Sequence, residues 1–255
     1  MTHPFLDHPG PIAFAHQGGN RERPENTYAS FAHAVSLGYR YLETDVHATA
    51  DGVVVVCHDP SLERTAARPG LIRQLPWREV SAARGAGDQP VPRLDEVLAS
   101  WPDARWNIDA KHPSVVDPLA DLLERAGALD RVCVTSFSDL RLARLRHRLG
   151  PGLCTALGPR AVTALRVASF LPDPRPLARG WAGAGAAQVP IRSRGIPVVD
   201  RRFVAAAHKA TLAVHVWTVD DEATMDALID LGVDGIMTDR PTVLKAVLSR
   251  RDLWL

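Results

Sequence analysis

The sequence predicts a parallel α/β barrel, a closed ring of strands in which each strand is followed by a helix. Short apolar or β-branched runs alternate with helical patterns and form about eight β-then-α units. The length of 255 residues is typical of one such barrel. We expect a single domain over residues 1–255, because no stretch has the composition of a linker.

The first two thirds of the chain alternate between short apolar runs, which predict strands, and longer runs of helical periodicity. The predicted strands cover residues 11–15, 41–47, 53–57, 106–110, 132–135 and 153–156. The predicted helices cover residues 27–37, 115–126 and 139–148. Residues 159–185 receive no firm assignment, because proline and glycine interrupt their helical pattern.

The last third repeats the same rhythm. Strands are predicted at residues 186–189, 212–219 and 235–237, and helices at residues 201–209, 221–231 and 241–248. Residues 60–100 are too long for an ordinary strand-to-helix connection, which takes roughly 2 to 6 residues. They contain Leu75, Pro76, Trp77 and a helical pattern at residues 94–99, so we expect an inserted subregion over the barrel mouth.

Composition excludes several classes of function. Thirty Lys and Arg residues face 29 Asp and Glu, so no net field recruits nucleic acid or an anionic membrane. Cys57, Cys133 and Cys154 lie in apolar stretches without metal-type spacing, which predicts buried, reduced thiols. No run approaches the roughly 18 apolar residues of a membrane span, and the N-terminus lacks a secretory pattern. We expect a soluble cytoplasmic protein with a small-molecule partner and no stable membrane insertion; its oligomeric state stays open.

Two histidines and two carboxylates near the N-terminus are the strongest chemical signal. His16 and His58 lie on either side of Glu43 and Asp45 in the chain, and all four are near the ends of predicted strands. Two imidazoles can pass a proton in each direction. Glu43 and Asp45 are two apart on a strand, so both side chains leave the same face and reach one cation. The group predicts a hydrolytic site.

The other polar candidates follow later strands of the predicted barrel. The carboxyl ends of barrel strands face the active site, so these residues share one rim. They are Asp109 and Lys111, then Ser136, then Trp217 with Thr218, and finally Thr238 with Asp239.

In their order and spacing, these motifs resemble the signature of glycerophosphodiester phosphodiesterases of the bacterial type. The matching motifs of the first half are His16-Gln17-Gly18-Gly19, Pro24-Glu25-Asn26-Thr27, Glu43-Thr44-Asp45-Val46, Asp51-Gly52, His58-Asp59, Arg64-Thr65 and Asn107-Ile108-Asp109-Ala110-Lys111. Those of the second half are Ser136-Phe137, Trp217-Thr218-Val219 and the run from Gly232 to Pro241. Each motif is weak alone, but the resemblance covers residues 13–248.

The resemblance implies a TIM (β/α)8 barrel of the phosphatidylinositol-phosphodiesterase type that cleaves glycerophosphodiesters to glycerol 3-phosphate and an alcohol. It further implies one divalent cation, held by Glu43, Asp45 and Asp109. Hard oxygen ligands suit Mg²⁺ or Ca²⁺, and the sequence does not choose between them. Most members carry Glu where Asp109 stands, and the shorter side chain retracts its carboxylate by roughly 1.5 Å.

A second departure concerns Gln17, where the family usually has an arginine that binds phosphate bidentately. Glutamine keeps a donor but loses the charge, so phosphate binding is expected to depend on Lys111 and the cation. Three nearby arginines are further candidates: Arg21, Arg23 and Arg64. We expect weaker anion affinity or an altered substrate, rather than an inactive protein.

In the predicted mechanism, His16 and His58 act on opposite sides of phosphorus, one as base and the other as acid. The attacking group is either water or the neighbouring glycerol hydroxyl, and which imidazole is the first base stays open. Asp59 is expected to orient His58, and His47 shares the face of Asp45. Asn26 is either a site residue or a helix cap. Trp217 either forms the floor of the substrate pocket or is simply buried.

Two alternatives stay open from the sequence. One is a lysophospholipase D, in which the inserted subregion and the apolar side chains of Phe170, Leu171, Leu177 and Trp181 shelter an acyl chain. The other is a catalytically silent barrel that binds a phosphorylated ligand, with Gln17 and Asp109 as signs of lost activity.

Overall fold

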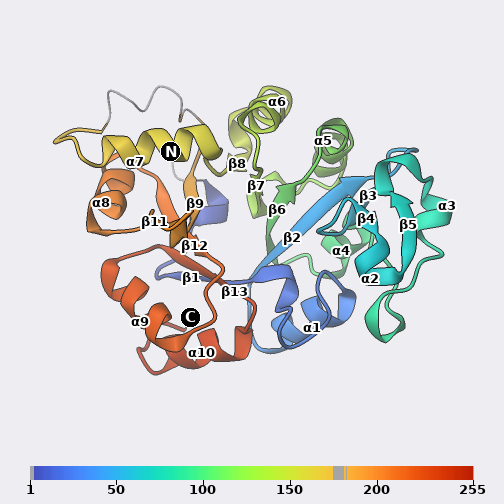
Figure 1. The fold of residues 1–255 in the computed structure, drawn as a ribbon, viewed down its shortest axis with the longest axis horizontal. Helices are drawn as coiled ribbons and strands as arrows, with labels where there is room; N and C mark the ends of the chain where they lie inside the picture. Colours follow the sequence, from blue (N-terminus) through green and yellow to red (C-terminus); the bar gives the residue numbers. More distant parts are fainter. Residues whose placement is uncertain (1–2, 175–180, 182, 255) are drawn as a thin grey trace.

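The fold is a barrel of eight parallel strands enclosed by helices, as the sequence predicts (Figure 1). A computed structural model describes residues 3–174, 181 and 183–254. Hydrogen-bonded neighbours run in the order β8-β7-β6-β2-β1-β13-β12-β9. A single parallel bridge between Ala156 and Ala186 joins the two ends of this order and closes the ring.

The barrel strands lie close to their predicted positions. They are β1 (Ile12–Ala15), β2 (Tyr41–Ala48), β6 (Arg105–Ala110), β7 (Val132–Thr135), β8 (Cys154–Thr155), β9 (Ala186–Pro190), β12 (Ala213–Trp217) and β13 (Gly235–Thr238). The helices that cover them are α1 (Tyr28–Ser36), α4 (Leu94–Ser100), α5 (Val116–Arg125), α6 (Asp139–Leu149), α7 (Pro159–Ala168), α8 (Arg201–Lys209), α9 (Glu222–Leu231) and α10 (Pro241–Ser249). Helix α7 occupies the start of the segment that the sequence left unassigned.

Strand β2 is longer than its neighbours because β3 (Val54–Val56) folds back and pairs antiparallel with its end. Every residue of β2 is buried. Its parallel register with β6 places Asp45 directly opposite Asp109. The sheet itself therefore brings together two carboxylates that are 64 positions apart in the sequence.

The inserted subregion forms a small layer beside the barrel, in the teal part of Figure 1. It contains β4 (Ser61–Leu62), α2 (Glu63–Ala66), β5 (Arg68–Leu71) and α3 (Trp77–Val80), with its own apolar cluster around Leu62, Ile72 and Val80. Helix α4 differs from the prediction, because Leu94, Val97 and Leu98 pack in the main core with the barrel helices. The insertion therefore ends before Leu94.

A short N-terminal helical turn, residues Pro4–Leu6, closes the end of the barrel opposite the predicted site. Phe5 is fully buried among Phe14, Tyr41 and Cys133. Arg105 donates to the carbonyl oxygen of Phe5 at 3.1 Å and fixes the turn. Aromatic packing thus fills the end of the barrel opposite the rim that carries the predicted site residues.

The three cysteines are buried and unpaired, as predicted. In the described part of the chain, no helix combines the length and apolar character that a membrane crossing needs. Of the apolar residues considered for an acyl chain, Phe170 and Leu171 are exposed, whereas Trp181 is buried. Leu177 lies outside the described residues.

Candidate active site

A buried cluster of three carboxylates and one lysine lies at the centre of the upper rim. Lys111 Nζ lies 2.7 Å from both Asp45 Oδ1 and Asp109 Oδ2. Burial would raise the pKa of Asp45, but Lys111 outweighs it and lowers this pKa. Burial raises the pKa of Asp109, and burial together with Asp45 raises that of Glu43 to about 8. Three adjacent acidic groups therefore share one fixed cation.

The turn after β1 satisfies these carboxylates from one side. The backbone N–H of Gln17 donates to Glu43 Oε2 at 3.0 Å, and its side-chain amide donates to Asp45 Oδ2 at 2.8 Å. Asn26 Nδ2 donates to the same Asp45 oxygen at 2.9 Å, and Asn26 Oδ1 accepts from the Thr44 hydroxyl at 2.8 Å. Both Gln17 and Asn26 have positive φ, as such tight turns require. Thr27, not Asn26, caps α1.

His16 is held between two acidic residues. Its Nδ1 lies 2.6 Å from Asp239 Oδ1, and its Nε2 lies 3.7 Å from Glu43 Oε2. Burial would lower the pKa of His16, but Glu43 and Asp239 outweigh it and raise this pKa to about 9. Asp239 follows β13, and its backbone N–H donates to Asp220 at 2.8 Å. The last strand of the barrel therefore orients the first histidine.

His58 follows β3 and is more exposed, with 46% of its side chain accessible. Its Nδ1 lies 2.8 Å from Asp59 Oδ1. Arg64 donates to Asp59 at 2.6 Å and makes two hydrogen bonds to Glu25. The hydrogen bond from Arg64, with that from His58, lowers the pKa of Asp59 to about 2. His47 Nε2, which lies 3.2 Å from the His58 carbonyl oxygen, supports the same loop.

Two aromatic side chains flank the mouth of the site. Trp217 and Phe137 meet edge to face with ring centroids 5.7 Å apart, and Phe137 is 64% exposed. Lys111 Nζ lies 5.9 Å from the centre of the Phe137 ring. Ser136 accepts a hydrogen bond from Arg141 at 2.7 Å, which brings a further cation near the cluster. This side of the rim is apolar and positively charged, a surface that suits an organic phosphate.

The donor chemistry of the cluster fits a hard divalent cation, although Lys111 lies between two of the carboxylates. Asp109 Oδ1 is buried and has no hydrogen-bond partner, so one oxygen atom is left for a cation. The three carboxylates carry more formal charge than Lys111 balances. Across the described residues, no group of three His, Cys, Asp or Glu side chains is arranged as a ready metal site.

The structure brings the predicted site residues together on one rim, with three differences in their contacts. The amide of Gln17 is turned to Asp45. Arg64 is paired with two carboxylates, and Arg23 donates to a backbone carbonyl at 2.8 Å. The sequence reasoning placed Asp239 on the rim but gave it no role. Its position directly after the last strand was the available signal.

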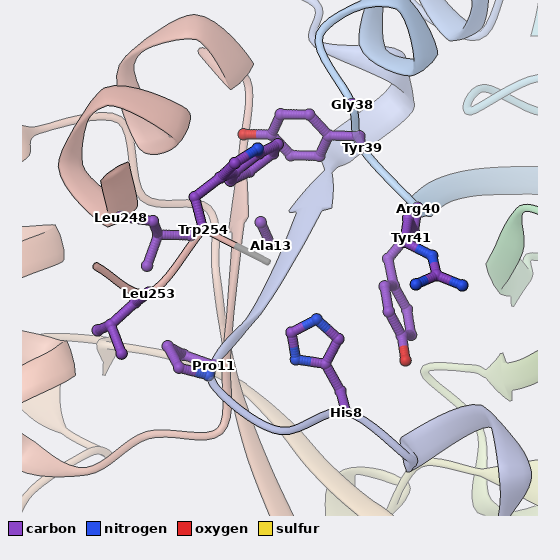
Figure 2. Close-up of a pocket in the computed structure, with 10 residues that line it drawn as sticks. All are labelled: His8, Pro11, Ala13, Gly38, Tyr39, Arg40, Tyr41, Leu248, Leu253 and Trp254. Carbon is purple, nitrogen blue, oxygen red and sulfur yellow. The ribbon is translucent and has the colours of Figure 1, made fainter. Parts of the chain in front are cut away.

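A cavity at the opposite end of the barrel from these residues is drawn in Figure 2. It is lined by the residues that precede β1 and β2 and by Trp254, which packs on Tyr39 with ring centroids 5.0 Å apart. It contains none of the predicted site residues, so it is set apart from the chemistry of the rim.

Comparison with known proteins gives consistent matches over almost the whole chain. The model of the glycerophosphoryl diester phosphodiesterase family matches residues 16–243. The Mycobacterium tuberculosis protein named "Probable glycerophosphodiester phosphodiesterase 2" is 39% identical over 251 residues, covering 98% of this chain and 95% of that protein.

Two solved structures share the fold. A glycerophosphodiester phosphodiesterase from Agrobacterium tumefaciens is 26% identical with a TM-score of 0.75, covering 92% of this chain and 99% of that one. A phosphodiesterase from Oleispira antarctica, solved with the product sn-glycerol-3-phosphate, is 21% identical with a TM-score of 0.78; the match covers 94% and 97% of the two chains.

Proposed function

This chain belongs to the glycerophosphoryl diester phosphodiesterase family, and on that premise we propose that it hydrolyses glycerophosphodiesters to glycerol 3-phosphate and an alcohol. The observation that carries the proposal is the pair of histidines, each with its own carboxylate partner, near the Asp45–Lys111–Asp109 cluster. The name of the Mycobacterium relative supports the same activity.

The two imidazoles divide the proton transfers between them. One removes the proton from the attacking hydroxyl, and the other donates a proton to the leaving oxygen. Asp239 orients His16, and Asp59 orients His58, so each ring presents its Nε2 atom to the reacting group. An internal attack by the glycerol hydroxyl would first form a cyclic phosphate, which water then opens with the roles reversed.

Positive charge at the phosphate comes from this chain through Lys111. Its ammonium group lies over the buried carboxylates, and burial fixes its position. Glu43, Asp45 and Asp109 would hold Mg²⁺ or Ca²⁺ beside it. When bound, such a cation supplies charge that offsets the phosphoryl oxygens. Gln17 stabilises Asp45 in this arrangement, and Trp217 with Phe137 faces the carbon atoms of the substrate.

The test is release of glycerol 3-phosphate from glycerophosphocholine and glycerophosphoethanolamine, with Mg²⁺ or Ca²⁺ supplied and with a chelator as a second arm. We expect release, and we expect His16→Ala or His58→Ala to lower turnover by roughly 10² to 10⁴. The exposed His147→Ala is the matched control, since its side chain lies on α6 away from the rim.

Two results would decide against this assignment. No release from any glycerophosphodiester would leave a barrel that only binds a phosphorylated ligand. Near-normal turnover of one histidine variant would remove that residue from the mechanism. A matched lysophospholipid included in the same assay separates a lysophospholipase D, which would release more phosphate product from the acylated substrate.

A further inference from the structure

A cavity beside His58 is the strongest feature that the mechanism leaves unused. Its empty space, including the part open to solvent, is about 370 Å³ and lies between the barrel rim and the inserted subregion. His58 and Asn26 line it from the catalytic side, so it is continuous with the site described above. The opposite walls come from α2 and from residues 89–92.

The walls of this cavity are mainly apolar. Val56 and Leu62 are buried below it, and Ala66 and Val91 are half-buried at its sides. Leu62 belongs to the small apolar cluster of the insertion, Ala66 and Val91 lie against that cluster, and Val56 belongs to the main core. Removal of carbon atoms from water against such walls favours binding by roughly 0.8 kcal/mol per methylene, about a fourfold gain in affinity.

The charges around the cavity balance one another. Glu25 is a lining residue, but both of its carboxylate oxygens accept hydrogen bonds from Arg64, at 2.6 and 2.8 Å. Arg64 also pairs with Asp59, which holds His58. With a proton on His58 for transfer, the four groups carry two positive and two negative charges. The cavity therefore gives no net attraction to a charged occupant.

We propose that this cavity is the subsite for the leaving alcohol and that it takes a short, uncharged carbon chain. The inference rests on the proposed phosphodiesterase function and adds the class of leaving alcohol.

The size of the cavity limits the occupant. A water molecule takes roughly 30 Å³ in the liquid, and at that density the whole 370 Å³, including the part open to solvent, would hold at most about a dozen non-hydrogen atoms. A long acyl chain has more carbon atoms than that, so the cavity alone would not cover one. It fits the alcohol half of a simple glycerophosphodiester.

The experiment uses glycerol 3-phosphate esters of methanol, ethanol and butanol, whose leaving groups have similar intrinsic reactivity. For the wild-type protein, kcat/KM should rise by about fourfold with each added methylene. Ala66→Leu and Val91→Phe fill the cavity and should flatten this rise, so that the butyl ester loses more kcat/KM than the methyl ester. Ala82→Leu, an exposed position of the same subregion, is the matched control and should keep the rise.

A second experiment tests the effect of positive charge on the leaving alcohol. It compares glycerophosphocholine with its uncharged isostere, the 3,3-dimethylbutyl ester. We expect the uncharged ester to have the higher kcat/KM. A higher value for choline, or a flat alkyl series in the wild-type protein, would overturn the proposal. Equal loss for methyl and butyl esters in both filling variants would also contradict it, since such a loss reports general damage.

Binding without turnover separates this proposal from the phosphodiesterase function itself. Fluorine NMR of 4,4,4-trifluorobutanol should show saturable binding to the wild-type protein and to Ala82→Leu, with at least a fivefold weaker affinity in Ala66→Leu. Binding without any diester cleavage would reject the catalytic function and keep the cavity as an alcohol site. Cleavage without binding and without an alkyl rise would keep the function and reject the subsite.

Discussion

At the scale of single residues, the two histidines are held in different ways. His16 is surrounded by Glu43 and Asp239 and is largely buried. His58 is exposed, and its orientation depends on a chain of ionic contacts through Asp59 and Arg64. A buried ring is fixed by packing, whereas an exposed ring needs such partners to stay aligned. The second histidine should therefore be the more sensitive to distant substitutions.

Arg64→Met tests that dependence. Removing the guanidinium frees Asp59, whose pKa should rise from about 2 toward its usual range, and His58 loses its fixed orientation. We expect kcat to fall by roughly 10- to 100-fold with little change in KM. Steady-state kinetics and carboxyl NMR measure the two effects.

The matched control is Arg144→Met, because Arg144 is similarly exposed and pairs with Asp117 at 3.0 Å on the outer helices. It should leave kcat unchanged. Arg64→Lys should restore part of the rate. If Arg64→Met instead lowers kcat and thermal stability in parallel, and Lys restores neither, the residue only stabilises the insertion.

Gln17→Arg tests the missing charge beside the phosphate. The new guanidinium can still donate to Asp45, and it adds a charge-assisted hydrogen bond worth about 1.5 kcal/mol or more, so KM should fall roughly tenfold. Gln17→Met is the neutral control, which removes the donor and should raise KM. An unchanged or higher KM in Gln17→Arg would show that this position serves the carboxylates alone.

Most of the site residues could be predicted from the sequence, because their spacing on strands fixes which way they point. Glu43 and Asp45 share a face through the two-residue period of β2. The pairing of His16 with Asp239 could not be predicted, since these residues are 223 positions apart. Nor does residue type show that the amide of Gln17 turns to Asp45; that follows from the local backbone.

At the scale of elements, the turn after β1 depends on its close contact with α1. Gly18 has a φ of 79°, and a Cβ atom there would lie 2.4 Å from Ser30 Oγ and 2.8 Å from the Ser30 backbone. The same turn carries His16 and Gln17. The turn that carries His16 therefore keeps its shape only if residue 18 has no side chain, because a Cβ atom there would overlap Ser30 of α1.

Gly18→Ala and Gly52→Ala form a matched pair for this contact. Gly52 has a φ of 82°, but a Cβ atom added there would have nothing within 4 Å. Both variants should lose about 1–2 kcal/mol of unfolding free energy from left-handed strain. Gly18→Ala should lose roughly 1–3 kcal/mol more from overpacking, together with activity. Urea unfolding and turnover distinguish them, and equal losses would contradict the contact argument.

The insertion shows where sequence patterns stop being informative about elements. The sequence shows that residues 60–100 are too long for a connection, but it does not show where the insertion ends. The hydrophobic period of α4 is the same whether the helix packs on the barrel or belongs to the insertion. Only the packing of Leu94, Val97 and Leu98 assigns α4 to the barrel. Short strands such as β4 and β5 carry too few residues for a periodic signal.

At the scale of the whole molecule, the barrel interior is polar in its middle layer. Gln188 donates to Asn107 at 2.7 Å, and its amide also lies 3.3 Å from His215 Nδ1. His215 is fully buried, and its Nε2 has no hydrogen-bond partner. Burial lowers the pKa of His215 to about 4. The folded barrel therefore holds this imidazole neutral under conditions that protonate it in the unfolded chain.

Acid stability should follow from that difference. Above pH 6.5 His215 is neutral in both the folded and the unfolded state. Between pH 6.5 and about 4 the unfolded chain binds a proton at His215, whereas the folded barrel does not. The free energy of unfolding should fall by about 3 kcal/mol across this window. His215→Asn, measured by urea unfolding from pH 7 to 4, should remove that part of the slope, whereas exposed His147→Asn should keep it. Identical slopes in all three proteins would refute the assignment.

The overall architecture was predictable because the count of alternating units and the rim of polar residues both require a closed parallel barrel. The site of closure was not predictable, since it depends on the shortest barrel strand. Strand β8 has two residues, and the ring closes there through one bridge between Ala156 and Ala186.

That closure makes one seam of the barrel weaker than the others. The link between β8 and β9 consists of two backbone hydrogen bonds, from Leu157 to Ala186 at 2.8 Å and from Gly185 to Thr155 at 2.9 Å. Local opening starts where the fewest bonds must break. Amide hydrogen exchange should therefore be fastest at Leu157 and Gly185, where β8 and β9 separate first. The β2–β6 pair, which carries the carboxylates, should stay protected from exchange.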